Sequence, residues 1–204
     1  MTIDIIQKAI DFAFEKATKD AIPGMESAQS LAENYIRKYP NNKKLQADNL
    51  INSQIKIAAT AGFVTSFGGL IAMPITIPAN LAAGLYLQTR MAAAIARIGG
   101  RNLNDEDVKN FVQGCLIGKT FVELLKKEGV KYLAKKLAPE IGVRVSRLVV
   151  TEMLTKVTAK GASNLAKAVP LLGGVVGGTL DAVWTKSVGE TAKKLFIEDV
   201  MSDA

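Results

Sequence analysis

The side chains that most often carry catalysis are scarce in this chain. It has no histidine, the commonest general base and metal ligand. Its one cysteine, Cys115, lies on an apolar stripe with no histidine to activate it, so we expect a buried structural thiol. The carboxylate pairs Asp105/Asp107 and Glu198/Asp199 are explained by a helix start and by a frayed tail. We therefore predict a protein that is not an enzyme and uses no metal or cofactor.

One segment resembles a phosphate-binding loop. GCLIGKT, residues 114–120, ends in the Gly-Lys-Thr of that motif, but three residues separate its glycines where the motif needs four. The segment also lies within a helical pattern and follows no strand, so a nest of backbone donors is not expected. We interpret these glycines as sites of close helix contact.

Positive charge is concentrated in the middle of the chain. Residues 119–167 carry 11 basic and 4 acidic side chains, which equals the net charge of +7 of the whole protein. Between residues 126 and 160 lysine predominates and Tyr132 is the one aromatic residue, which favours an anionic membrane surface over nucleic acid. A solvated helix face stays open as an alternative. The candidate anionic-lipid surface consists of Lys126, Lys127, Lys131, Lys135, Lys136, Arg144, Arg147, Lys156 and Lys160.

The elements that position these residues are organised around a stretch without charge. Residues 57–89 contain no Asp, Glu, Lys or Arg. Proline and glycine divide the stretch into arms at 57–73 and 75–89, each shorter than the about 20 residues of a membrane span. We expect a helical hairpin that is buried in the protein, with insertion into lipid as a second state. The hinge and core-packing residues are Gly68, Gly69, Pro74, Pro78, Asn80, Gly173, Gly174, Gly177 and Gly178.

Apolar spacing predicts helices along the rest of the chain and no strands. Their expected ranges are 3–21, 26–38, 43 into the charge-free stretch, 79–98, 104 to 129 with Asn104 as cap, 139–160 and 170–199. Asp181 is expected to pair with Arg90, Arg97 or a backbone amide, because an isolated buried carboxylate is costly. The fold class is all-α, with an amphipathic extension over residues 1–40 and a single multi-helix domain over 41–204.

Two segments resemble the EcsC family. They are GFVTSFGGLIAMPITIPANLAAGLYLQTRMAAAIARIGGRNLNDEDVKNF at 62–111 and AVPLLGGVVGGTLDAVWTKSVGETAKKLF at 168–196, and the resemblance covers about 44–200. The first segment is also similar to a GTPase-associated family of unknown function, which usually has aspartate at the position of Asn80. The EcsC resemblance implies a bacterial protein, sometimes encoded beside an ABC transporter, with no established enzymatic activity.

These observations leave three hypotheses. The first is a non-enzymatic, cytoplasmic protein at the inner face of the membrane, an accessory or regulator of a transport or secretion system. Its partners would be anionic lipid or a membrane protein, with an apolar ligand as a further option. The second is a membrane-inserting or pore-forming protein with a colicin-like hairpin. The third is an interaction or immunity module that masks a partner's apolar surface. The N-terminus has no basic start and no continuous apolar centre, so we expect no secretory signal.

Overall fold

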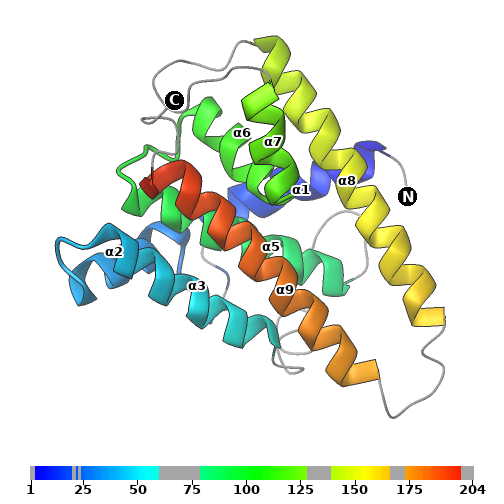
Figure 1. The fold of residues 1–204 in the computed structure, drawn as a ribbon, viewed down its shortest axis with the longest axis horizontal. Coiled ribbons are helices and arrows are strands. Elements are labelled where there is room, and N and C mark those ends of the chain that lie inside the picture. Colours follow the sequence, from blue (N-terminus) through cyan, green and yellow to red (C-terminus); the bar gives the residue numbers. More distant parts are fainter. Residues whose placement is uncertain are drawn as a thin grey trace.

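Every regular element in the described part of the chain is a helix. The structure, a computed structural model, describes residues 3–19, 22, 24–59, 79–127, 139–165 and 173–198, and at some helix ends the backbone alone. The elements are α1 (Ile3–Thr18), α2 (Ala28–Lys38), α3 (Lys43–Ala59), α5 (Ala79–Ile98), α6 (Glu106–Cys115), α7 (Lys119–Lys127), α8 (Pro139–Leu165), α9 (Gly173–Lys193) and the π-helix η1 (Lys194–Glu198) (Figure 1). This confirms the prediction of a single all-α domain.

Helix α5 lies at the centre of the fold. It contacts α1, α2, α3, α6 and α9, and these helices leave it little contact with water (Figure 1). Residues 91–96 are all fully buried, which covers more than one complete turn and so every side of the helix. Four of these six residues are alanine, and their small side chains let neighbouring helices approach from several directions. This helix begins and ends where the sequence predicted.

The charge-free stretch is described at its two ends. Residues 57–59 close α3, and residues 79–89 form the first half of α5. Within α5, residues 82, 83 and 85–89 are buried by other parts of the protein. The predicted hinge at Gly68, Gly69, Pro74 and Pro78 lies outside the described residues. Among the residues that are described, no helix is both long enough and apolar enough to cross a bilayer.

Helices α3 and α9 form the most extensive helix pair of the fold. Gly189 of α9 faces Ile51 of α3 so closely that a Cβ atom at position 189 would lie 2.7 Å from the Ile51 Cγ1 atom. An ion pair lies on the same pair of helices, because Lys193 Nζ is 2.7 Å from Asp48 Oδ1 and 3.0 Å from Glu190 Oε2. Glycine therefore permits the close approach, and the ion pair joins α3 to α9 at the edge of that contact.

Helix α1 is attached to α6 by a carboxylate. Asp11 accepts hydrogen bonds from Gln7 Nε2 at 3.0 Å and from Gln113 Nε2 at 2.9 Å, and it lies 3.1 Å from Lys109 Nζ. The apolar side of α1 belongs to the same core cluster as α5 and α6. Whether residues 1–40 form a separable extension stays a prediction.

The structure corrects the helix expected between 104 and 129. Its N-cap is Asp105 instead of Asn104, and the helix is interrupted between Cys115 and Lys119. Gly118 adopts a left-handed backbone with φ of 62°, and a Cβ there would lie 2.3 Å from Ser187 Oγ of α9. The apolar spacing continues across this break, so the spacing alone could not reveal it.

Other helix ends differ by a few residues from the prediction. Helix α1 ends at Thr18 instead of 21, and α8 continues through Gly161 to Leu165. The last helix begins at Gly173 and becomes a π-helix over Lys194–Glu198. Phe196 lies within this π-helix, and its carbonyl oxygen packs against Gly99, the residue that follows α5.

Replacing Gly99 should destabilise the fold. A Cβ on Gly99 would lie 2.3 Å from the Phe196 carbonyl oxygen, so Gly99→Ala must push η1 away from α5. We expect the free energy of unfolding, measured by urea denaturation, to fall by about 1–3 kcal/mol. The matched control is Gly84→Ala within α5, where the atom nearest to the added Cβ, Trp184 Cζ3, lies at 3.5 Å. Alanine favours a helix interior, so this control should be at least as stable as the wild type. Equal stability of the two variants would refute the close contact.

The Asp11 cluster should contribute stability that acid removes. Burial by itself raises the pKa of Asp11, but hydrogen bonds from Gln7, Gln113 and Lys109 outweigh burial and hold the pKa below its ordinary value. The contribution is therefore present above the unfolded-state pKa of about 4 and is lost as the pH falls through the lower folded-state pKa. We expect Asp11→Asn to lower the unfolding midpoint in urea at neutral pH, and the difference from wild type to shrink below about pH 4. A difference that does not vary with pH would contradict this account.

Candidate functional site

Neither the thiol nor the loop-like segment forms a reactive site. Cys115 is fully buried in α6 and donates to the Phe111 carbonyl oxygen at 3.2 Å, and burial raises the pKa of its thiol. The backbone N–H groups of Leu116, Ile117 and Gly118 already donate to carbonyl oxygens three residues earlier. They are therefore not available to a phosphate. Among the described residues, no three His, Cys, Asp or Glu side chains are grouped so that they could hold a metal ion.

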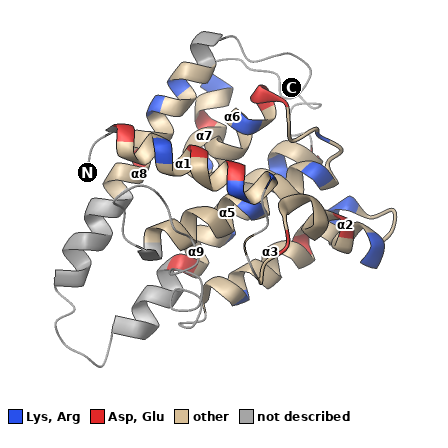
Figure 2. Cartoon of the chain, turned by 180° about the vertical axis from the view of Figure 1, so that it is seen from behind, with Lys and Arg blue, Asp and Glu red and all other residues tan. Residues whose placement is uncertain are grey.

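The structure describes part of the predicted anionic-lipid surface. Lys126 and Lys127 are exposed on α7, and Arg144 and Arg147 are exposed on α8. Figure 2 shows basic residues on α7 and on the first half of α8 at the same end of the molecule. Lys131, Lys135 and Lys136 lie outside the described residues, and for Lys156 and Lys160 the backbone of α8 alone is described.

The glycines predicted to pack closely lie at the start of α9. Gly173, Gly174, Gly177 and Gly178 belong to that helix, and Asn80 lies in the first turn of α5, but only their backbone is described. Close packing through glycine is described elsewhere, at Gly114, where a Cβ would lie 2.3 Å from the Phe121 ring.

The expected polar pairing of Arg90, Arg97 and Asp181 takes a different form. Arg97 and Asp181 are half-buried. Arg90 is only 4% exposed, and it donates hydrogen bonds to α3 and to the segment before α2 instead of to α9. The buried cation of α5 therefore has partners that the sequence did not indicate.

The guanidinium of Arg90 is held by two neutral oxygens. Nη1 donates to the Glu26 carbonyl oxygen at 3.0 Å, and Nη2 donates to Gln54 Oε1 at 2.9 Å. Its central carbon lies 5.9 Å from the centroid of the Tyr86 ring, which is a cation–π distance. The Nε atom is buried and has no hydrogen-bond partner within the part of the chain that the structure describes. Among the described residues, no carboxylate makes an ion pair with this side chain.

The pKa of Arg90 is lowered, because the surrounding groups do not fully offset the effect of burial on its charge. Burial lowers the pKa of Arg90 below its ordinary value. Electrostatic interactions with Tyr86, Glu26 and Tyr35 raise the pKa, but by less than burial lowers it. An arginine nevertheless keeps its proton, because its pKa is so high. The side chain is thus a positive charge inside the protein, and the Glu26 carboxylate acts on it through its electrostatic field.

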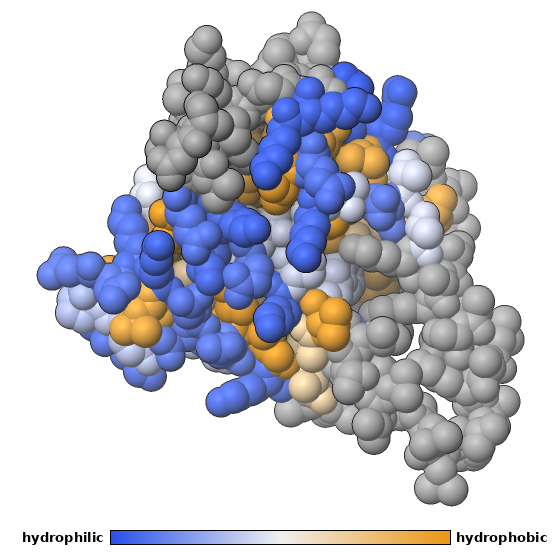
Figure 3. Space-filling view, in the orientation of Figure 1, coloured by the Kyte–Doolittle hydropathy of each residue, from blue (hydrophilic) through white to orange (hydrophobic). Residues whose placement is uncertain are grey.

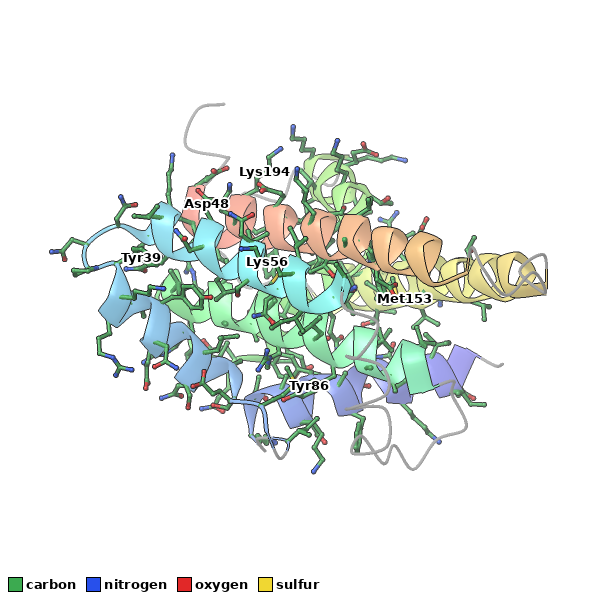
Figure 4. The ribbon with its side chains drawn as sticks, turned by 90° about the horizontal axis from the view of Figure 1, so that it is seen from below. Tyr39, Asp48, Lys56, Tyr86, Met153 and Lys194 are labelled. Carbon is green, nitrogen blue, oxygen red and sulfur yellow. The ribbon has the colours of Figure 1, made fainter. Side chains whose placement is uncertain are left out.

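Arg90 lines an open groove of about 670 Å³ between α2 and α3. Helix α2 contributes residues 31, 34, 35 and 38, which share one helix face, and α3 contributes residues 53, 54 and 57. Residues 24–26, which precede α2, also line the groove. In Figure 4, α2 and α3 diverge from their connecting turn near Tyr39, and α5 is seen between them. The groove therefore combines polar groups with a buried cation from the central helix.

Sequence reasoning identified Arg90 but missed the rest of this groove. The available signal was Gln54, because it lies three or four residues after Leu50 and Ile51 on the buried face of α3. A glutamine on an apolar face requires a polar partner. The Glu26 contact uses a backbone carbonyl, which any residue could supply, so no side-chain pattern could have revealed it.

Cys115 should be unreactive until the protein unfolds. The thiol is fully buried and its pKa is raised by burial, and the thiolate is the reactive form. We expect labelling by a maleimide to be negligible in the native protein and to follow the unfolded fraction when urea is added. Wild type and Cys115→Ser in urea serve as the positive and negative controls. Rapid labelling of the native protein at neutral pH would show that the thiol is accessible.

Comparison with known proteins places the chain in a family. The model of the EcsC protein family matches residues 2–197. No curated protein and no solved structure matches significantly. The match includes the first 40 residues, which the motif resemblance had left outside. The chain therefore belongs to the EcsC protein family.

Proposed function

We propose that this protein is a non-enzymatic accessory of a membrane system, and that it binds the inner membrane surface through the basic end formed by α7 and α8. The observation that carries the proposal is the exposure of Lys126 and Lys127 on α7 and of Arg144 and Arg147 on α8. Figure 2 shows basic residues of these two helices at one end of the fold. A cluster of cations on a protein surface attracts anionic lipid headgroups. The absence of histidine and the burial of Cys115 support the non-enzymatic part.

The charge balance of this end supports electrostatic binding. Lys119 is a further exposed cation on α7, whereas the acidic side chains described on α7 and α8 are Glu123 and the half-buried Glu152. On α7, Phe121 and Leu125 are buried against the core, and Val122 and Leu124 are half-buried. This end therefore presents mainly positive charge to a membrane, and Val143 of α8 is its exposed large apolar side chain among the described residues.

The rest of the described surface gives less support to apolar insertion. In Figure 3 the coloured part of the surface is largely hydrophilic, with smaller apolar areas between the hydrophilic residues. The exposed large apolar residues that the structure describes come from four different helices: Ile36, Leu45, Val143 and Val183. Because they are not gathered on one element, we favour binding by charge over insertion of an apolar face.

Removing cations from the basic end should weaken binding to anionic vesicles. Each lysine or arginine near an anionic surface contributes about 1 kcal/mol, so Lys126→Gln/Lys127→Gln should reduce partitioning by about 30-fold. Arg144→Gln/Arg147→Gln should have an effect of similar size. Co-sedimentation with phosphatidylcholine vesicles that contain phosphatidylglycerol measures the bound fraction, which should also fall as salt is added.

The matched control removes the same charge elsewhere. Lys44 and Lys56 are exposed on α3, and Lys44→Gln/Lys56→Gln has the same net charge as either test variant. We expect this control to bind nearly as well as the wild type. Equal losses in all three double variants would mean that net charge, and not this end of the molecule, determines binding. Equal binding to pure phosphatidylcholine vesicles, or none to either, would refute the proposal.

A further inference from the structure

We propose that the groove between α2 and α3 binds one anionic amphiphile, with a carboxylate or phosphate headgroup at Arg90 and an alkyl chain along the apolar wall. The groove lies on different helices from the basic end, so this inference does not depend on membrane binding. It rests on three features of the described residues: a buried cation without a paired anion, a positively charged lining, and an apolar wall.

The first feature is the state of Arg90. Transfer of a charge into the protein interior is costly unless the charge is paired and hydrogen-bonded. Among the described residues, two neutral oxygens accept from the five N–H donors of Arg90, and none accepts from its Nε–H. A ligand oxyanion at the groove side of this guanidinium would supply the missing counter-charge and accept charge-assisted hydrogen bonds. The geometry thus favours an anion over a neutral ligand.

The second feature is the charge of the remaining lining. Lys38 is a second cation, exposed at the α2 side of the groove, with its Nζ 5.5 Å from the Tyr39 ring. Glu26 is the acidic side chain of the described lining, and its Oε1 already accepts from Asn34 Nδ2 at 2.7 Å. Two cations and one carboxylate leave the described lining with a charge of +1. An anion is therefore attracted to the groove as well as to Arg90.

Other polar groups of the lining already have partners. Tyr35 Oη donates to Ser53 Oγ at 2.7 Å, and Ser53 Oγ donates to the Leu50 carbonyl oxygen at 2.8 Å. Gln54 Oε1 is occupied by Arg90. These hydrogen bonds connect α2, α3 and α5, so they hold the walls of the groove in place without competing for the headgroup.

The third feature is the apolar part of the wall. Met25, Leu31 and Ile57 line the groove beside its polar residues. The volume of about 670 Å³ lies within the range of about 300–1,000 Å³ that is usual for small-molecule sites. A free inorganic anion would leave this wall in contact with water, whereas an alkyl chain would cover it. This is why we infer an amphiphile instead of a small ion.

Calorimetric titration of the purified full chain tests the proposal without vesicles. The probes, kept below their micellar concentrations, are decyl phosphate, decanoate, inorganic phosphate and the uncharged decyl maltoside. We expect saturable binding with one site for decyl phosphate or decanoate, and the tighter of the two identifies the headgroup. Inorganic phosphate should bind at least about tenfold more weakly, because it covers no apolar surface. Decyl maltoside should be weaker by a similar factor, because it brings no charge.

Variants locate the site. Arg90→Met should weaken decyl phosphate at least about tenfold through loss of charge-assisted hydrogen bonds. Since that variant alters the core, its fold is checked by circular dichroism, and two surface variants give independent answers. Lys38→Glu should weaken decyl phosphate several-fold, whereas Lys44→Glu, the same charge change outside the groove, should not. Met25→Trp should weaken the binding of decyl phosphate, because the larger side chain would fill the groove beside the apolar wall. Lys126→Gln/Lys127→Gln should leave the affinity for decyl phosphate unchanged, which separates this site from the basic end.

Any of the following results would overturn the inference. They are no saturable binding of either charged amphiphile, equal affinity for decyl phosphate and inorganic phosphate, equal affinity for decyl phosphate and decyl maltoside, and unchanged affinity in both Lys38→Glu and Met25→Trp. Weakening by Lys126→Gln/Lys127→Gln alone would assign the binding to the basic end and would also overturn it.

Discussion

The structure depends on the burial of α5, which has almost no side open to water. Its neighbours must cover it from every direction, and small side chains at the contacts allow this: alanines within α5, Gly99 under Phe196, and Gly189 of α9 against α3. Three consecutive polar residues of this helix, Gln88, Thr89 and Arg90, are buried together with its apolar residues. Their polar groups lose contact with water when the protein folds, and so each needs a hydrogen-bond partner within the protein in place of water.

The protein groups that replace water around Arg90 determine the local architecture. Gln54 on α3 and the Glu26 carbonyl before α2 both turn toward the guanidinium, and α2 and α3 remain apart above it. The same residue thus connects the central helix to the two helices that form the groove. A buried arginine held only by neutral oxygens is a weak source of stability. Its placement beside an open groove is more readily explained by recognition of an anion than by packing.

Local sequence signals predicted the bounds of α5, which proline and glycine mark, whereas Gly161 does not end α8. Pro78 and the Gly99–Gly100 pair delimit α5, and the structure has the helix at those bounds. The break between α6 and α7 was missed because apolar spacing continues across it, whereas its cause is the contact of Gly118 with Ser187, far along the chain. The groove was missed for the same reason. Its walls come from α2, α3 and α5, and its key acceptor at Glu26 is a backbone carbonyl, so only the packed structure brings them together.

The most direct test of this account is the NMR signal of the Arg90 Nε–H, assigned by its absence from Arg90→Lys. In the free protein this proton should exchange slowly with water, because the atom is buried, whereas the signal of the exposed Arg147 should exchange rapidly. Addition of decyl phosphate should shift the Arg90 signal, and inorganic phosphate at the same concentration should shift it little. Rapid exchange in the free protein, or an unchanged signal at saturating decyl phosphate, would contradict the account.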